Sequence, residues 1–241
     1  LQGAGMPVPA SRIAEKYPDL LTPAQKRELK GDVLAERTRL ASITARPHSA
    51  RFDIADRVLA EYARTIAAWQ DNPDARQDIV RLRLDRLSAL HARKRYADVV
   101  QEYEALIDQG VRIPDYGLSV VASSYLTLRE PETAAQLYQR LLQTPEGEWR
   151  AQRRADDEIG LYYALLESGR YEEALSVIAQ ANERQPVWLY IPGQPERMPN
   201  PGKLDTAITQ TMAYYALDDL ETAESRIDVM VEKAPNNTAL R

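Results

Sequence analysis

Tyrosines and carboxylates recur together in segments that precede short turns of this chain, and such pairs suit the binding of sugars. Asp156, Tyr163 and Glu167 lie before the turn at Gly169. Aromatic rings stack on pyranose faces, and carboxylates pair with ammonium groups. These residue types therefore predict contacts with a sugar polymer that carries free amines, provided that the side chains line one surface.

Other segments offer comparable side chains before their own turns. The further candidates are Asp205, Met212 and Tyr215 in one segment, Tyr116, Ser123 and Leu126 in another, and Asp85 and His91 in the first. A competing interpretation makes each tyrosine an ordinary packing residue. Tyr162–Tyr163 and Tyr214–Tyr215 are doublets, so one member of each should face the core and the other a groove.

A proline-rich stretch at residues 186–202 supplies two more aromatic candidates, Trp188 and Tyr190. The stretch contains five prolines, so it cannot be a continuous helix. Loops of this length in a compact array are usually functional or disordered, and aromatic residues argue against simple disorder. We expect the two rings to cover the end of a groove, to meet a protein partner, or to cover apolar surface of the array itself.

The patterns that accompany catalysis are absent from the sequence. There is no HExxH motif, no GxSxG motif and no glycine-rich phosphate loop. The two histidines, His48 and His91, are far apart, and there is no cysteine. Acidic pairs such as Glu172-Glu173 fit helix starts and solvated turns. The sequence therefore predicts a protein that is not an enzyme, with no catalytic residue, cofactor or metal site.

Charge and hydropathy limit the classes of partner. The formal net charge is −5, which disfavours nucleic acid because phosphate binding needs a basic face. A cationic or polar partner fits better. No run of about 18 apolar residues occurs, so no membrane-spanning segment is predicted.

Four stretches of the chain repeat one helical hairpin. The clearest, LYYALLESGRYEEALSVIAQANERQP, covers residues 161–186. Early in the second helix of each hairpin a small or β-branched residue is followed by a large side chain and then by a packing residue: Val99, Tyr103, Leu106; Ala134, Tyr138, Leu141; Ala174, Ile178, Ala181; Ala223, Ile227, Met230. Small residues let paired helices approach closely. The pattern resembles tetratricopeptide repeats and predicts an all-α superhelix, an α-solenoid of antiparallel hairpins.

The rest of the chain suggests three regions. Residues 1–10 are rich in Gly and Pro and are expected to be extended or disordered. Residues 11–77 should form long helices, either degenerate repeats or a cap; one begins at Thr22-Pro23 and another covers about 51–69. Residues 78–241 should hold about four hairpins with the inserted loop 186–202. Because residues 236–241 look like the start of another helix, we expect a fragment of a larger protein.

Three features together resemble one family of exporters. They are the segments RFDIADRVLAEYARTIAAW and DIVRLRLDRLSALHARKRYADVV, the hairpin that ends at Pro186, and the insertion PGQPERMPNPG before a last hairpin. This arrangement resembles the periplasmic repeat region of the outer-membrane porins that export poly-β-1,6-N-acetyl-D-glucosamine in biofilm-forming Gram-negative bacteria. The resemblance implies a periplasmic scaffold that binds the polysaccharide deacetylase and the partly deacetylated amino-sugar polymer.

Two other functions remain open from the sequence. One is a generic peptide-binding assembly or co-chaperone module of the same repeat class. Modules that clamp peptide carboxylates use Lys and Arg on the wall of first helices, whereas the clearest copies here place Asp, Tyr, Glu and Met there. The other is an accessory region of a hydrolase.

Overall fold

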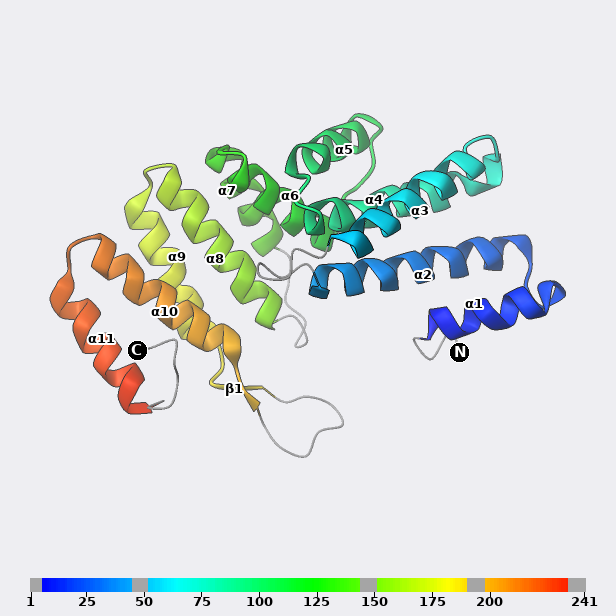
Figure 1. Ribbon diagram of the computed structural model, residues 1–241. Coiled ribbons are helices and arrows are strands. Elements are labelled where there is room, and N and C mark those ends of the chain that lie inside the picture. Colours follow the sequence, from blue (N-terminus) through cyan, green and yellow to red (C-terminus); the bar gives the residue numbers. More distant parts are fainter. Residues whose placement is uncertain (1–5, 45–51, 144–150, 190–197, 234–241) are drawn as a thin grey trace. The chain divides into compact units, whose positions relative to one another are not determined.

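A computed structural model describes residues 6–44, 52–143, 151–189 and 198–233 (Figure 1). The chain divides into two compact units, Leu1–Leu128 and Arg129–Arg241. The described residues are mainly helical, as the all-α prediction requires. None of the helices among them is long and apolar enough to cross a bilayer.

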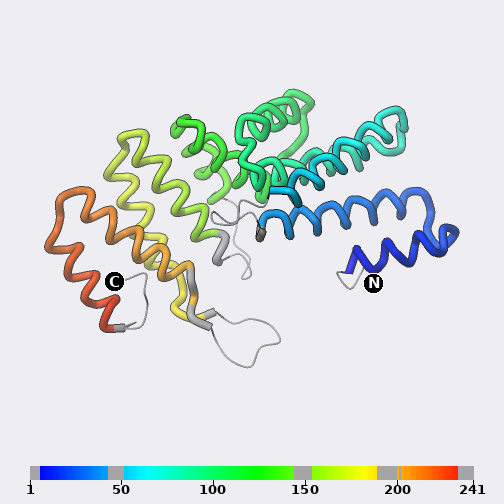
Figure 2. The backbone as a smooth tube through the Cα atoms, in the orientation of Figure 1, coloured from blue at the N-terminus to red at the C-terminus, as the bar shows by residue number. Residues whose placement is uncertain are grey.

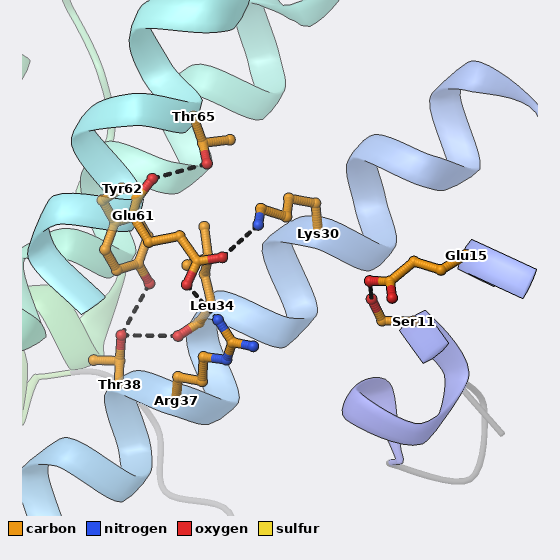
Figure 3. Close-up of polar contacts among 9 residues, drawn as sticks. All are labelled: Ser11, Glu15, Lys30, Leu34, Arg37, Thr38, Glu61, Tyr62 and Thr65. Atoms are coloured by element: carbon orange, nitrogen blue, oxygen red, sulfur yellow. Dashed lines mark hydrogen bonds and ion pairs between the residues drawn. The ribbon is translucent and has the colours of Figure 1, made fainter. Parts of the chain in front are cut away.

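The first unit is a stack of helices that pack on their neighbours in the chain. Its elements are α1 (Pro7–Lys16), η1 (Pro18–Leu20), α2 (Pro23–Thr44), α3 (Asp53–Trp69), η2 (Pro73–Ala75), α4 (Arg76–Ala92), α5 (Tyr96–Asp108) and α6 (Asp115–Thr127). Helices α2, α3 and α4 pack on one another, as do α4, α5 and α6, while α1 lies on α2. The Tyr62 and Thr38 hydroxyls, 3.0 Å apart, join α3 to α2 in the core (Figure 3).

The second unit repeats the same plan. Its elements are α7 (Pro131–Leu142), α8 (Ala151–Glu167), α9 (Tyr171–Arg184), β1 (Trp188–Leu189), β2 (Met198–Pro199), α10 (Pro201–Ala216) and α11 (Leu220–Lys233). Helix α8 packs on α7 and α9, α10 packs on α8 and α9, and α11 packs on α10. The strands β1 and β2 pair antiparallel, with Trp188 opposite Pro199. Figure 2 shows α8 to α11 as successive hairpins along the backbone.

Local chemistry explains where several helices begin. The backbone N–H of Gln25 donates to the Thr22 hydroxyl at 3.3 Å, and the backbone N–H of Thr22 donates to Gln25 Oε1 at 2.9 Å. This reciprocal capping box, with Pro23 in the first turn, starts α2 where the sequence predicted a helix. Asn200 caps α10, since its Oδ1 accepts from the Gly202 amide at 3.0 Å.

One backbone feature marks the turn of every hairpin. Lys94, Arg129, Gly169 and Asp218 have positive φ angles of 62°, 68°, 74° and 63°. Each stands five residues before the site that the sequence assigned to a small residue, namely Val99, Ala134, Ala174 and Ala223. Those four side chains are at most 1% exposed. The predicted register of the four hairpins therefore agrees with backbone geometry and with burial.

Two local expectations differ from the structure. Residues 7–10 lie in α1 and are not extended, because prolines are compatible with a helix's first turn. Ile227 is 40% exposed although a packing role was predicted. Ile227 is exposed because α11 packs on α10 among the described helices, whereas α9, which carries the equivalent Ile178, packs on both α8 and α10. The assignment of residues 11–77 as degenerate repeats or a cap stays a prediction.

Candidate functional site

The first helices of the last two hairpins, α8 and α10, carry the clearest candidate surface. Asp156 and Asp205 are separated by 49 residues, as are Tyr163 and Met212, and as are the buried markers Ala174 and Ala223. Equal spacing places these pairs at equivalent positions of successive hairpins. Because α8 and α10 pack side by side (Figure 1), the equivalent side chains lie on neighbouring helices. The surface formed by these residues is called the α8–α10 wall below. It consists of Asp156, Tyr163 and Glu167 on α8 and of Asp205, Met212 and Tyr215 on α10.

The aromatic and apolar members of this wall are open to solvent. Tyr163 is 38% exposed, whereas its neighbour Tyr162 is 3% exposed and packs edge-on against it with ring centroids 5.0 Å apart. Tyr215 is 69% exposed, while Tyr214 is half-buried with the Arg226 guanidinium 5.7 Å from its ring centroid. In each doublet one ring is thus more buried than the other, in line with the sequence pattern. That the exposed ring faces a groove stays a prediction.

The acidic members differ in their surroundings. Asp156 is exposed and Asp205 is half-buried. Glu167 pairs with Arg129 at 3.1 Å, at the end of α8. The whole second unit is acidic, with 12 Lys and Arg against 19 Asp and Glu, which gives a formal charge of −7. The first unit has 19 Lys and Arg against 17 Asp and Glu, a formal charge of +2.

The candidates of the first unit are engaged in internal contacts. The Tyr116 hydroxyl donates to Asp85 Oδ1 at 2.7 Å, and Arg81 lies 3.8 Å from the same carboxylate. Burial raises the pKa of Asp85, against the lowering effect of the Tyr116 hydrogen bond. Burial and the hydrogen bond to Asp85 also raise the pKa of the Tyr116 hydroxyl. These groups are better placed to join α4 to α6 than to bind a ligand.

His91, another candidate of the first unit, is also held inside the packing. Its Nε2 lies 3.2 Å from the Ser123 hydroxyl, and its ring packs edge-on against Tyr96 at 5.4 Å. Burial lowers the pKa of His91. The described residues contain no group of His, Asp and Glu that could hold a metal ion.

The loop candidates are only partly described. Trp188 lies in β1 and is 53% exposed, so its ring is available to a ligand or partner. Tyr190 lies outside the described residues.

Sequence reasoning missed one hollow in the first unit. It lies between α2 and α3, has a volume of about 400 Å³, and is lined by Lys30, Glu61, Arg64, Thr65, Ala68 and Trp69. The recurrence of five of these residues along one face of α3 was the available signal. We call it the α2–α3 hollow.

Comparison with known proteins adds a family context to this geometry. No family model matches the chain. The chain is 36% identical over 216 residues to the poly-beta-1,6-N-acetyl-D-glucosamine export protein of Escherichia coli strain K12, and equally to that of strain O157:H7. The predicted resemblance is confirmed. The match covers 89% of this chain and 26% of the exporter, so the chain spans about a quarter of the curated relatives' length.

A solved structure supports the fold. The crystal structure of YrrB, described as a TPR protein with an unusual peptide-binding site, aligns with 95% of this chain and 94% of its own. The TM-score is 0.55 and the sequence identity is 14%. The similarity confirms the tetratricopeptide-repeat fold that the repeated small residues of the sequence predicted.

Proposed function

We propose that this chain is a non-enzymatic scaffold region of an exopolysaccharide exporter, located in the periplasm. In this role the α8–α10 wall binds the partly deacetylated amino-sugar polymer, and the repeats also dock the polysaccharide deacetylase. The similarity to the export protein supports the exporter context, and the tetratricopeptide fold supports a binding role.

The composition of the wall carries the polymer part of the proposal. Asp156 and Asp205 offer carboxylates at equivalent positions of α8 and α10, and Tyr163 offers an exposed ring on α8, seven residues after Asp156. A glucosamine residue has an apolar pyranose face and an ammonium group, which match a ring and an acid respectively. The charge of −7 in the second unit adds a longer-range attraction for a polycation.

Titration with short oligomers tests the polymer role. We expect partly deacetylated β-1,6-glucosamine oligomers to shift the amide signals of α8 and α10 in NMR spectra, and acetylated oligomers to bind more weakly. Tyr163→Ala and Asp156→Asn should each reduce the affinity about two- to fivefold, because each contact is solvent-exposed. The matched control is Tyr171→Ala, which removes a 54% exposed tyrosine from the start of α9.

Two outcomes would reject the polymer role. One is equal affinity for acetylated and deacetylated oligomers. The other is an equal loss of affinity in Tyr171→Ala and Tyr163→Ala.

The deacetylase role rests on the family resemblance and needs its own experiment. The purified chain, immobilised through a terminal tag, should retain the cognate deacetylase in the absence of polymer. Trp188→Ala is the informative variant, because Trp188 is an exposed aromatic residue outside the wall. No retention of the deacetylase would remove this partner and leave the polymer proposal standing.

A further inference from the structure

The α2–α3 hollow is a cationic site in a chain whose overall charge is negative. Lys30 and Arg37 from α2 converge on the carboxylate of Glu61 on α3 (Figure 3), with Lys30 Nζ at 2.5 Å. One carboxylate thus shares two cations, which leaves a local excess of one positive charge. Arg64, one helical turn further along α3, raises that excess to two.

Arg64 is the cation of this hollow most available to a ligand. Its side chain is exposed and makes no ion pair with any described residue. By contrast, the Lys30 ammonium is already paired with the Glu61 carboxylate at 2.5 Å. Glu61 therefore positions Lys30, and Arg64 is left to supply the donors that a planar anion needs.

The far end of the hollow is apolar. Trp69 is half-buried and Ala68 is exposed, and both lie on the face of α3 that continues from Arg64. An indole ring and a guanidinium that line the same hollow make a surface that favours a ligand with a charged end and an apolar body. The volume of about 400 Å³ lies within the range of ordinary ligand sites and has room for a few side chains.

We infer that the α2–α3 hollow binds an acidic peptide segment of a partner protein. One carboxylate lies between Lys30 and Arg64, and the adjacent apolar side chain of the peptide lies against Trp69. Charge complementarity selects this occupant, because the lining of the hollow holds two cations, Lys30 and Arg64, against one carboxylate, Glu61, and would repel the ammonium groups of a deacetylated amino sugar. The inference goes beyond the proposed polymer role and does not depend on it, since it concerns other helices.

The test uses the whole chain and two amidated tetrapeptides, acetyl-Leu-Glu-Leu-Glu-amide and the neutral acetyl-Leu-Gln-Leu-Gln-amide. The readout is the indole N–H signal of Trp69 in NMR spectra; Trp69→Phe assigns it among the three tryptophans. We expect the acidic peptide to shift this signal in a saturable way and the neutral peptide to leave it unchanged. Arg64→Gln should weaken binding about fivefold, as expected for an exposed ion pair.

Arg57→Gln is the matched control. Arg57 lies two turns before Arg64 on α3, is 75% exposed, and pairs with Asp53 at 2.5 Å, so its loss should leave the affinity unchanged. Three results would overturn the inference: equal shifts of the Trp69 signal with both peptides, no shift with either peptide, or an equal weakening of peptide binding by Arg57→Gln. A Trp69 shift caused by deacetylated sugar oligomers or by inorganic phosphate alone, at the same concentration, would also overturn it.

Discussion

At the scale of single residues, two glycines inside helices report opposite packing conditions. A Cβ atom on Gly160 of α8 would lie 2.4 Å from Tyr138 Cζ and 2.6 Å from its hydroxyl. Tyr138 is 4% exposed, so its ring has little room to move. The three atoms nearest to a Cβ on Gly31 of α2 would all belong to the Arg81 guanidinium, the closest at an ordinary 3.5 Å.

Gly160→Ala should therefore destabilise the protein by about 1–3 kcal/mol, the usual cost of overpacking. Gly31→Ala should stabilise it by about 0.5–1 kcal/mol, because alanine has the higher helix propensity and the site has space. Urea unfolding followed by circular dichroism measures both changes. An unchanged midpoint for Gly160→Ala would mean that α7 and α8 are not in close contact at Tyr138.

His91 makes stability depend on pH. Burial lowers its pKa in the folded state, so the folded protein takes up this proton less readily than the unfolded chain. The contribution of His91 is therefore complete above the unfolded pKa, about 6.5, and is lost as pH falls through the folded pKa. His91→Gln should lose less stability than the parent between pH 7.5 and pH 5 in urea unfolding. Equal losses in the two proteins would contradict this role.

At the scale of elements, the hairpin turns make a conformational demand that only one of them meets with glycine. Gly169 has φ of 74°, and no atom lies within 4 Å of the place that a methyl group would take on it, so an alanine there would be strained without clashing. The equivalent Asp218 already holds a φ of 63° with a side chain. Left-handed backbone costs an ordinary residue about 1–2 kcal/mol, and Asp somewhat less.

Gly169→Ala should accordingly destabilise the second unit by about 1 kcal/mol, and Asp218→Gly should be neutral or slightly stabilising. Thermal unfolding of the two variants beside the parent measures the pair. A loss of stability in Asp218→Gly would show that its side chain contributes more than its backbone strain costs.

The elements were largely predictable from sequence, and the contacts between them were not. Ala174 and Ala223 revealed the register because close helix packing demands small residues at repeated positions, and Thr22-Pro23 marked a helix start through local capping chemistry. Lys30 and Glu61 gave no such signal. They are 31 residues apart on two helices, and their meeting depends on how α2 and α3 rotate about their axes.

The same limit applies to the candidate site. Sequence spacing placed Tyr163 on an exposed face, since its doublet partner had to be buried. It could not indicate that the Tyr116 hydroxyl would bond to Asp85, because that depends on how α4 packs on α6.

At the scale of the whole molecule, the two units differ in formal charge. The first unit carries +2, and the second unit, which contains the α8–α10 wall, carries −7. Attraction between exposed charges is screened over about 10 Å at 0.1 M salt and about 3 Å at 1 M. The affinity for partly deacetylated oligomers should therefore fall several-fold between about 50 mM and about 500 mM NaCl. The affinity for acetylated oligomers should change little. Calorimetric titration at several salt concentrations measures this, and parallel salt dependence for both ligands would exclude an electrostatic origin.

The constant distance from each left-handed turn residue to its buried small residue has a consequence for protein engineering. From one hairpin to the next the interval grows from 35 to 40 to 49 residues, yet the five-residue spacing at the turn never changes. The extra length lies in the first helices, since α8 has 17 residues and α10 has 16 against 13 in α6, and in the connections that lead from a second helix to the following first helix. Foreign epitopes or reporter peptides should thus be grafted into those connections, while the tight reversals at Lys94, Arg129, Gly169 and Asp218 are left intact.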